Sequence, residues 1–158
     1  MQNGATVANG DVLWFLHADS VIHPDCDALI DRTLEHGCWG GFAVRLSGRK
    51  LLLRVVESSM NARSRFTGIL TGDQGIFVSR KLFYRVGGFT DLALMEDIDL
   101  STRLKRVKRP VFVSGFALGT SSRRWESRGI IRTIIRMWLL RTAFYLGVPA
   151  RLLAPYYV

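Results

Sequence analysis

A histidine and an aspartate directly follow an apolar run near the start of the chain. The run extends from Val12 to Leu16, and His17 and Asp19 stand at its exit. Hard divalent cations such as Mg²⁺ prefer oxygen ligands and often bind only one or two carboxylates together with substrate phosphates. Asp19 is therefore a candidate metal ligand. Asp is also common as a cap in the turn after a strand, and this second interpretation fits the residue equally well.

Three further acids, Glu96, Asp97 and Asp99, stand close together in the second half of the chain. The helix dipole favours negative charge at the start of a helix, which accounts for this composition. The mostly apolar lead-in from Phe89 to Leu94 suggests more, because a carboxylate beside apolar residues can have a raised pKa and act as a general base. Asp97 and Asp99 would lie about 200° apart on a helix, so they cannot both face one reacting group.

Two polar loops could contact a ligand. The segment Thr71-Gly72-Asp73-Gln74-Gly75 has glycines that permit tight turns and close approach of a ligand, although a plain turn is the simpler interpretation. The segment from Ser121 to Glu126 includes Arg124, whose guanidinium could bind diphosphate oxygens, beside the flat apolar wall of Trp125. The alternative for this second segment is a solvated basic loop.

Alternating strands and helices must position these residues. Apolar runs predict strands at residues 12–16, 38–46, 76–78 and 111–113. Periodic apolar residues, caps and glycine stops predict helices at residues 24–37, 51–66, 79–88, 96–107 and 127–146. This order predicts an α/β fold. The first run is apolar throughout, so we expect a strand buried on both faces, as in a parallel sheet. No glycine-rich dinucleotide motif or P-loop motif is present.

The composition indicates one folded domain. The chain has 158 residues, of which 48% are apolar and 22% are charged, which is not the composition of a disordered tail. Its apolar runs are shorter than the roughly 20 residues of a membrane span, and its first ten residues lack the basic region of a secretory signal. Two cysteines in no paired motif exclude a disulfide scaffold and a cysteine-based zinc site. These features predict a cytoplasmic protein.

The charge is distributed unevenly along the chain. The net charge of +9 is the result of −5 in residues 1–40, +3 in residues 41–99 and +11 in residues 100–158. A basic C-terminal segment implies an anionic partner: phosphate groups, nucleic acid or a lipid surface. Nucleic acid fits least, because no recognition motif is present and the aromatic residues alternate with Ile and Leu rather than line a basic groove.

The expected last helix, residues 127–146, has features of a membrane-surface helix. Arg128, Arg132 and Arg136 recur every four residues and would form one stripe. Ile and Met residues together with Trp138 cover much of the remaining surface, which is the pattern of a helix that lies on an anionic membrane. The alternative is a helix packed on its own domain with its arginines in water.

Five motifs follow one another in order along the chain. They are N-G-A-x-x-A-x-G-D-V-L-x-F-L-x-A-D from Asn3, G-D-Q-x-x-F-V from Gly72, G-G-F from Gly87, M-E-D-x-D-L-S-x-R-L from Met95 and R-R-W from Arg123. This ordered set resembles glycosyltransferase family 2, whose members have the GT-A fold. The nearest likeness is to its subgroup of radical-SAM- or selenodomain-associated transferases, and it extends from Gln2 to about Leu153.

The resemblance implies a role for each acidic candidate. Asp19 would match the second acid of the D-x-D motif, which holds a Mg²⁺ or Mn²⁺ ion and the diphosphate of the donor. His17 stands where the first Asp of that motif usually stands, so it would adjoin the metal. Glu96 and Asp97 would match the E-D motif, with Asp97 as the catalytic base and Glu96 as its neighbour.

The resemblance also implies roles for the two polar loops. Gly72, Asp73 and Gln74 would lie near the donor sugar or the acceptor. The segment from Ser121 to Trp125 would match the motif Q-x-x-R-W, with Arg124 near the diphosphate and Trp125 beside it. Ser121 stands where the family has Gln, which is a departure from the family's acceptor contact.

As a whole, the likeness implies a partial GT-A, Rossmann-like domain with a mostly parallel mixed sheet. Residues 1–126 would form the catalytic part, with the acceptor and metal sites, and residues 127–158 a basic amphipathic helix and tail. The family's N-terminal nucleotide-binding half would lie before Gln2. The implied function is inverting, metal-dependent transfer of a hexosyl-like sugar from a nucleotide-diphosphate donor to a hydroxyl acceptor.

The hydroxyl acceptors that the likeness allows include lipid-linked ones. The protein itself would then lie in the cytoplasm, peripherally on the inner face of the plasma membrane. The alternative is a non-catalytic remnant or regulatory half that binds an anionic membrane surface. Neither hypothesis includes a nucleic-acid partner.

Overall fold

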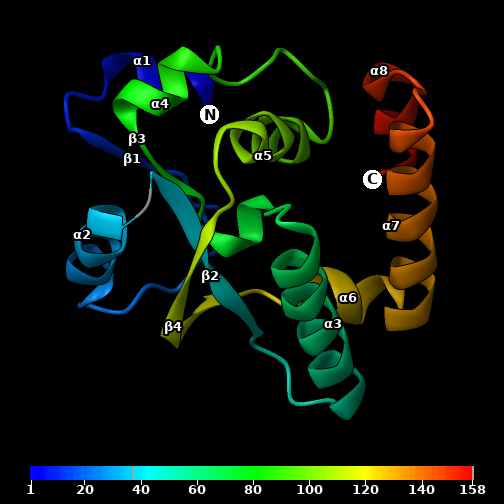
Figure 1. The fold of residues 1–158 in the computed structure, drawn as a ribbon. Coiled ribbons are helices and arrows are strands. Elements are labelled where there is room, and N and C mark those ends of the chain that lie inside the picture. The colour runs from blue at the N-terminus through cyan, green and yellow to red at the C-terminus, as the bar shows by residue number, and fades with distance from the viewer. Residues whose placement is uncertain (37, 158) are drawn as a thin grey trace.

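The computed structural model describes residues 1–36 and 38–157, and it is an α/β structure (Figure 1). Its helices are α1 (Gln2–Val7), α2 (Cys26–His36), α3 (Leu51–Thr67), α4 (Arg80–Arg85), α5 (Glu96–Val107), α6 (Arg123–Arg128), α7 (Ile130–Tyr145) and α8 (Ala150–Leu153). Its strands are β1 (Val12–Trp14), β2 (Trp39–Leu46), β3 (Phe77–Ser79) and β4 (Val111–Thr120), and short 3₁₀ turns are η1 (Gly72–Gln74) and η2 (Ala154–Tyr156). The helices expected at 51–66 and 96–107 are confirmed by α3 and α5.

The strands form an open mixed sheet in the order β1-β3-β2-β4. β3 pairs antiparallel with both β1 and β2, whereas β2 and β4 run parallel. The expected mixed sheet is confirmed, but the expectation that it is mostly parallel is wrong for the part of the chain that the structure describes. β1 lies at the edge of this sheet with Val12 and Trp14 only partly buried, so the expected burial on both faces is also wrong. An apolar run indicates burial but does not reveal the direction of the neighbouring strand.

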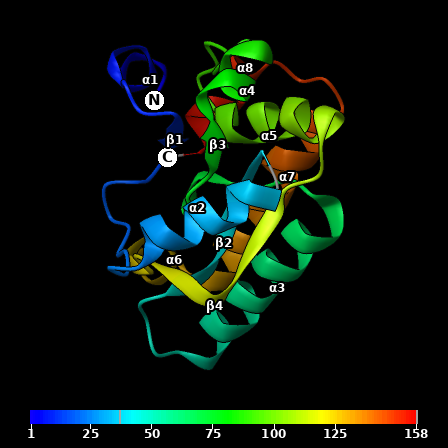
Figure 2. The same ribbon diagram turned by 60° about the vertical axis from the view of Figure 1, so that its left-hand side comes forward.

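Helices cover both faces of the sheet (Figure 2). Phe77 and Val78 are neighbours in β3, so their side chains point to opposite faces. Phe77 belongs to a buried cluster with Cys26 and Ile30 of α2. Val78 belongs to a second cluster, which includes Leu100 of α5 and residues of α4. The sheet is thus the middle layer, with α2 on one side and α4 and α5 on the other.

The last part of the chain contains a helix break that the sequence did not predict. α6 ends at Arg128 and α7 begins at Ile130, and Gly129 between them has a φ of +84°, a conformation that favours glycine. The single helix expected at 127–146 is therefore wrong. Arg128 does not continue the stripe of Arg132 and Arg136, which both lie on α7.

α7 and α8 pack back on the domain beside α5 (Figure 1). Leu140 of α7 and Leu153 of α8 are buried in one apolar cluster with Met95 and Ile98. These two residues flank the acidic start of α5. The C-terminal segment therefore lies against the element that positions the candidate base.

Candidate active site

A residue in the left-handed region precedes the acidic start of α5. Met95 has a φ of +65° and a ψ of 24°, which residues other than glycine rarely adopt, and its side chain is buried. Within residues 1–36 and 38–157 it is the one non-glycine residue with positive φ. Such strain persists where packing enforces it, and it is common at functional sites. The packing of Met95 against Leu140 and Leu153 supplies that constraint.

Two hydrogen bonds hold the Asp97 carboxylate in place. Its Oδ2 accepts a hydrogen bond of 2.8 Å from the backbone N–H of Gly72, and its Oδ1 accepts one of 2.8 Å from the N–H of Ile98. The backbone N–H of Leu70 also donates to the buried Ser101 hydroxyl of α5 at 2.7 Å. The loop around η1 is therefore tied to α5 at two points, and both ties fix the position of Asp97.

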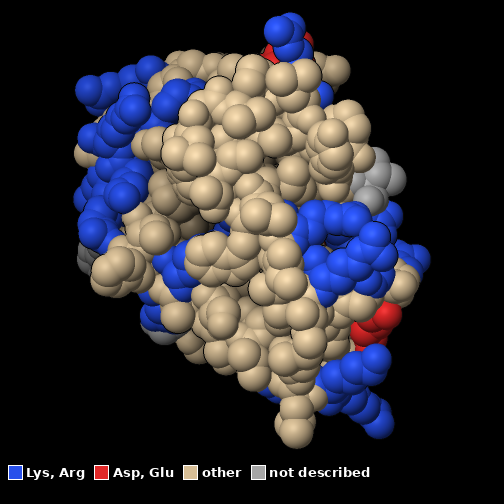
Figure 3. Space-filling model, turned by 90° about the vertical axis from the view of Figure 1, so that its right-hand side faces the viewer, with Lys and Arg blue, Asp and Glu red and all other residues tan. Residues whose placement is uncertain are grey.

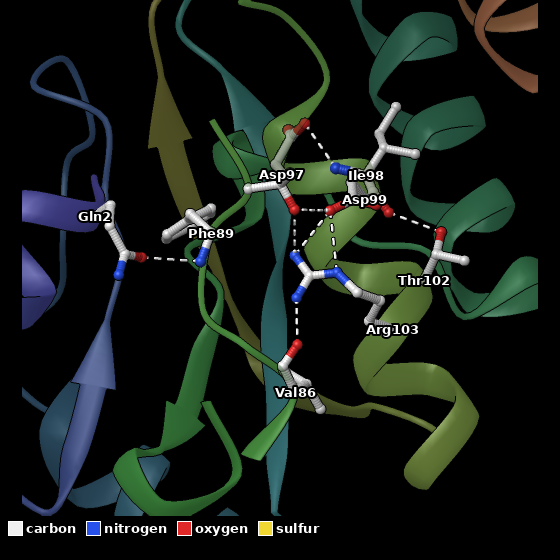
Figure 4. A network of polar contacts seen from close by, with 9 residues as sticks. Gln2, Val86, Phe89, Asp97, Ile98, Asp99, Thr102 and Arg103 are labelled. Carbon is white, nitrogen blue, oxygen red and sulfur yellow. Dashed lines mark hydrogen bonds and ion pairs between the residues drawn. The ribbon is translucent and has the colours of Figure 1, made fainter. Parts of the chain in front are cut away.

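Asp99 faces away from Asp97 and already has partners. Its Oδ2 pairs with the Arg103 guanidinium at 2.7 Å and accepts a hydrogen bond of 2.7 Å from the Thr90 hydroxyl. Figure 4 shows the Arg103–Asp99 pair on the side of α5 away from the Asp97 carboxylate. Glu96 is partly exposed and makes no hydrogen bond or ion pair with the residues that the structure describes. Of the three acids, Asp97 is the one that the loop around η1 positions.

Asp73 lies where three chain segments meet. Burial raises the pKa of its carboxyl, and the carboxylates of Asp97 and Asp19 raise it further, whereas His17 and a hydrogen bond from Thr120 lower it. The Thr120 hydroxyl donates to Asp73 Oδ1 at 3.4 Å from the end of β4. The exit of the first strand, the η1 turn and the start of α5 therefore bring their polar residues together.

Gly72 positions two other residues of this cluster. A Cβ atom at Gly72 would collide with the His17 imidazole, so the close approach of these two segments requires glycine. The backbone N–H of Gly72 holds Asp97 at the same time. Gly72 is buried, so its part in the site is to make room for His17 and to hold Asp97.

Gln74, which was expected to contact a substrate, is completely buried. Its Oε1 accepts hydrogen bonds from the Ser64 hydroxyl at 2.8 Å and from the Thr71 N–H at 3.2 Å, and its Nε2 donates to the Phe42 carbonyl at 3.4 Å. The buried side chain is directed into the protein rather than toward a ligand, and the expected place of this turn near the donor sugar or the acceptor stays a prediction. Gln74 instead ties the η1 turn to α3 and β2, because a turn can direct a polar side chain inward as easily as outward.

Arg124 and Trp125 also have partners inside the protein. Arg124 Nη2 donates to the Tyr157 carbonyl at 2.7 Å, and its guanidinium lies 3.8 Å from the centroid of the Tyr157 ring. Trp125 packs against an apolar cluster of β2 and α3 that includes Val44 and Leu53. In this arrangement Arg124 is engaged with the C-terminal segment and Trp125 with the β2 and α3 cluster, and the expected place of both near a diphosphate stays a prediction.

Two residues that the motifs did not indicate, Arg63 of α3 and Tyr145 of α7, join the acidic cluster. Burial lowers the pKa of Arg63, while Tyr145, Asp97 and Asp73 raise it. Burial raises the pKa of Tyr145, Arg63 lowers it, and Asp97 raises it. The Arg63 guanidinium and the Tyr145 phenol are therefore in electrostatic contact with the carboxylates.

The Arg63 guanidinium is only partly satisfied. Its Nη2 donates to the Ser64 hydroxyl at 3.0 Å, while its buried Nε has no hydrogen-bond partner among the described residues. The sequence does contain a pattern that could have indicated a functional role for Arg63. Arg63 shares a helical face with Val56 and Met60, and a charged residue on an apolar face is unusual unless it has a specific role.

Asp19, Asp73 and His17 are the donors that could hold a divalent ion. Carboxylate oxygens suit Mg²⁺ and Mn²⁺, and a bound cation would relieve the carboxylate repulsion that contributes to the raised pKa of Asp73. In the described part of the chain, no group of three or more His, Cys, Asp or Glu side chains is already arranged around a metal position. An ion held by only one or two carboxylates would complete its shell with oxygens of water or of a ligand.

No family model matches the chain, and comparisons with curated proteins and with solved structures give no match either. The likeness to glycosyltransferase family 2 therefore rests on the ordered motifs alone. The chemistry of the site is argued below from the residues that the fold brings together.

Proposed function

We propose that the chain supplies the catalytic part of a glycosyltransferase that moves a sugar from a nucleotide-diphosphate donor to a hydroxyl acceptor. The observation that supports this most is the close packing at Gly72, whose N–H holds Asp97 and whose Cα lies against His17, with Asp73 next to it in the same turn. The carboxylates of Asp97 and Asp19 contribute to the raised pKa of Asp73, and a group with a perturbed pKa is typical of a functional site. A site that binds a cation and a diphosphate accounts for this arrangement.

Asp19 and Asp73 are the proposed ligands for Mg²⁺ or Mn²⁺, with His17 beside them. When bound, such an ion stabilises negative charge on a leaving diphosphate. Arg63 is the proposed guanidinium for the same diphosphate, because it interacts electrostatically with Asp73 and Asp97 and its Nε has no partner among the described residues. It takes the part first expected of Arg124.

Asp97 is the proposed general base. The oxygen of the acceptor hydroxyl forms a bond to C1 of the sugar, the bond from C1 to the diphosphate oxygen breaks, and the hydroxyl proton passes to the Asp97 carboxylate. This single displacement inverts the configuration at C1. The hydrogen bonds from Gly72 and Ile98 occupy one lone pair on each Asp97 oxygen and leave another free for the proton.

Release of nucleoside diphosphate from a panel of nucleotide sugars tests the proposal, with Mn²⁺ present and with soluble and lipid-linked hydroxyl acceptors supplied. We expect release from a defined donor, loss of release after chelation, and recovery when Mn²⁺ is restored. Asp19→Asn should reduce release at limiting Mn²⁺. Asp25→Asn, an exposed acid outside the cluster, is the matched control. Equal release by both variants, or none from any donor, would contradict the proposal.

A further inference from the structure

α7 has apolar residues on both of its long faces. One face, with Ile130, Thr133 and Leu140, is buried against the domain. On the other face Ile131, Ile135, Trp138 and Leu139 are exposed, and Trp138 and Leu139 are each 65% exposed. A surface helix of a folded domain usually has one apolar stripe, which it buries, so a second apolar stripe is unusual. The outer face of α7 therefore lacks a cover among the residues that the structure describes.

The exposed apolar surface continues at both ends of α7. At the C-terminal end Leu146 is exposed. At the other end a shallow groove of about 300 Å³ is lined by Leu52 of α3 and by Ile131. We call these residues, together with Ile135, Trp138 and Leu139, the outer α7 surface. Exposed apolar residues gathered in this way usually mark a binding surface, whereas single ones need no explanation.

Basic residues flank the outer α7 surface. Figure 3, which shows this side of the molecule, has an uncharged central region with Lys and Arg groups along both edges and few acidic groups. Lys50 and Arg132 are exposed and line the same groove as Ile131. An apolar centre with Trp and a basic border matches the surface of an anionic bilayer. There the apolar side chains can enter the interfacial region while the basic side chains contact the lipid phosphates.

A second copy of the chain is a poorer occupant for this surface. The chain has a net charge of +9, and the border of the outer α7 surface is basic (Figure 3). Two such faces brought together would place positive charges opposite each other, which disfavours self-association. The charge pattern therefore favours an anionic occupant.

We propose that the outer α7 surface lies on an anionic lipid bilayer, with Trp138 and Leu139 in the interfacial region and Lys50 and Arg132 at the lipid phosphates. In the part of the chain that the structure describes, no helix is both long and apolar enough to cross a bilayer. The contact is therefore peripheral. It uses none of the carboxylates of the candidate site, so it does not depend on the transfer reaction.

Vesicle co-sedimentation tests this contact directly. We expect the chain to sediment with mixed phosphatidylcholine–phosphatidylglycerol vesicles, weakly with phosphatidylcholine alone, and less as salt rises. The double variant Lys50→Gln/Arg132→Gln should bind the vesicles about 25-fold more weakly, because each lost charge weakens binding about fivefold. Trp138→Ala with Leu139→Ala should abolish sedimentation. Phe66→Ala, which alters an exposed apolar residue outside this surface, should leave binding unchanged.

A second measurement needs no variant. Spin-labelled anionic lipids should quench the tryptophan fluorescence of the unaltered chain, because Trp138 is the most exposed of its tryptophans. Sedimentation that is unchanged in the Trp138→Ala/Leu139→Ala variant, or absence of quenching, would overturn the proposal. A lipid-free dimer that this variant dissociates would also overturn it, because the surface would then be a protein interface.

Discussion

Replacing Asp97 with Asn should lower the turnover number about 10²–10⁴-fold, the usual loss on removing a general base. Asn keeps the shape of the side chain but cannot take the acceptor proton. Its Oδ1 can still accept one of the two hydrogen bonds that the Gly72 and Ile98 N–H groups donate to the carboxylate, and the loss of the other leaves the α5 backbone in place. Donor affinity should therefore change little. Turnover and the donor dissociation constant, measured separately, distinguish loss of the base from loss of binding.

Asp99→Asn is the matched control, because it makes the same chemical change two residues further along α5. It weakens the ion pair with Arg103, which is partly exposed. We therefore expect the free energy of unfolding to fall by no more than about 1 kcal/mol. Turnover should stay close to that of the unaltered protein. A severe loss in Asp99→Asn with a mild effect in Asp97→Asn would show that the assignment of the base is wrong.

Asp73→Asn should stabilise the fold while it weakens the binding of Mn²⁺. Burial and the neighbouring carboxylates of Asp97 and Asp19 raise the pKa of Asp73 above its ordinary value of 3.8. The charged carboxylate is therefore unfavourable in the folded protein at neutral pH. Asn removes that charge, and a gain of about 0.5–2 kcal/mol in the free energy of unfolding would match other stabilising single substitutions.

The gain from Asp73→Asn should depend on pH. The folded protein binds the Asp73 proton more tightly than the unfolded chain does, so the unaltered protein loses stability as pH rises through the folded pKa. Below the ordinary pKa of 3.8, residue 73 should contribute similarly to the free energy of unfolding in both proteins. Above the pKa of Asp73 in the folded protein, the difference in the free energy of unfolding should be largest. Chemical denaturation across this pH range measures it. A difference that shrinks as pH rises would contradict the sign of the shift.

Mn²⁺ should reverse the order of stability. An ion at about one hundred times its dissociation constant adds about 2.7 kcal/mol to the stability of a protein that binds it only when folded. The unaltered chain should gain this amount, and Asp73→Asn should gain less. Equal stabilisation of both proteins by Mn²⁺ would place the ion away from Asp73.

Local features of α5 could be predicted from the sequence because they depend on neighbouring residues. The helix extends from Glu96 to Val107 as expected, Ile98 is buried, and Asp97 and Asp99 consequently point in different directions. Helical periodicity alone determines these properties. The fold class also followed from the alternation of strands and helices.

Other features depend on contacts between distant segments, and the sequence did not reveal them. The antiparallel pairing of β3 with both neighbours involves residues far apart in the chain. A lone glycine within a periodic pattern is compatible with a continuous helix, so Gly129 did not indicate the break between α6 and α7. Arg63 and Tyr145 enter the acidic cluster only because α3 and α7 both pack near α5.

Mn²⁺ titration of the isotope-labelled chain, followed by amide NMR signals, tests most directly whether Asp19 and Asp73 form one cation site beside Asp97. Paramagnetic Mn²⁺ broadens the signals of nearby nuclei. The account predicts that broadening begins at Asp19 and at the η1 turn, and that Asp73→Asn suppresses it at both places. Broadening that begins instead at the exposed acidic residues of α2, with the η1 turn unaffected, would contradict the account.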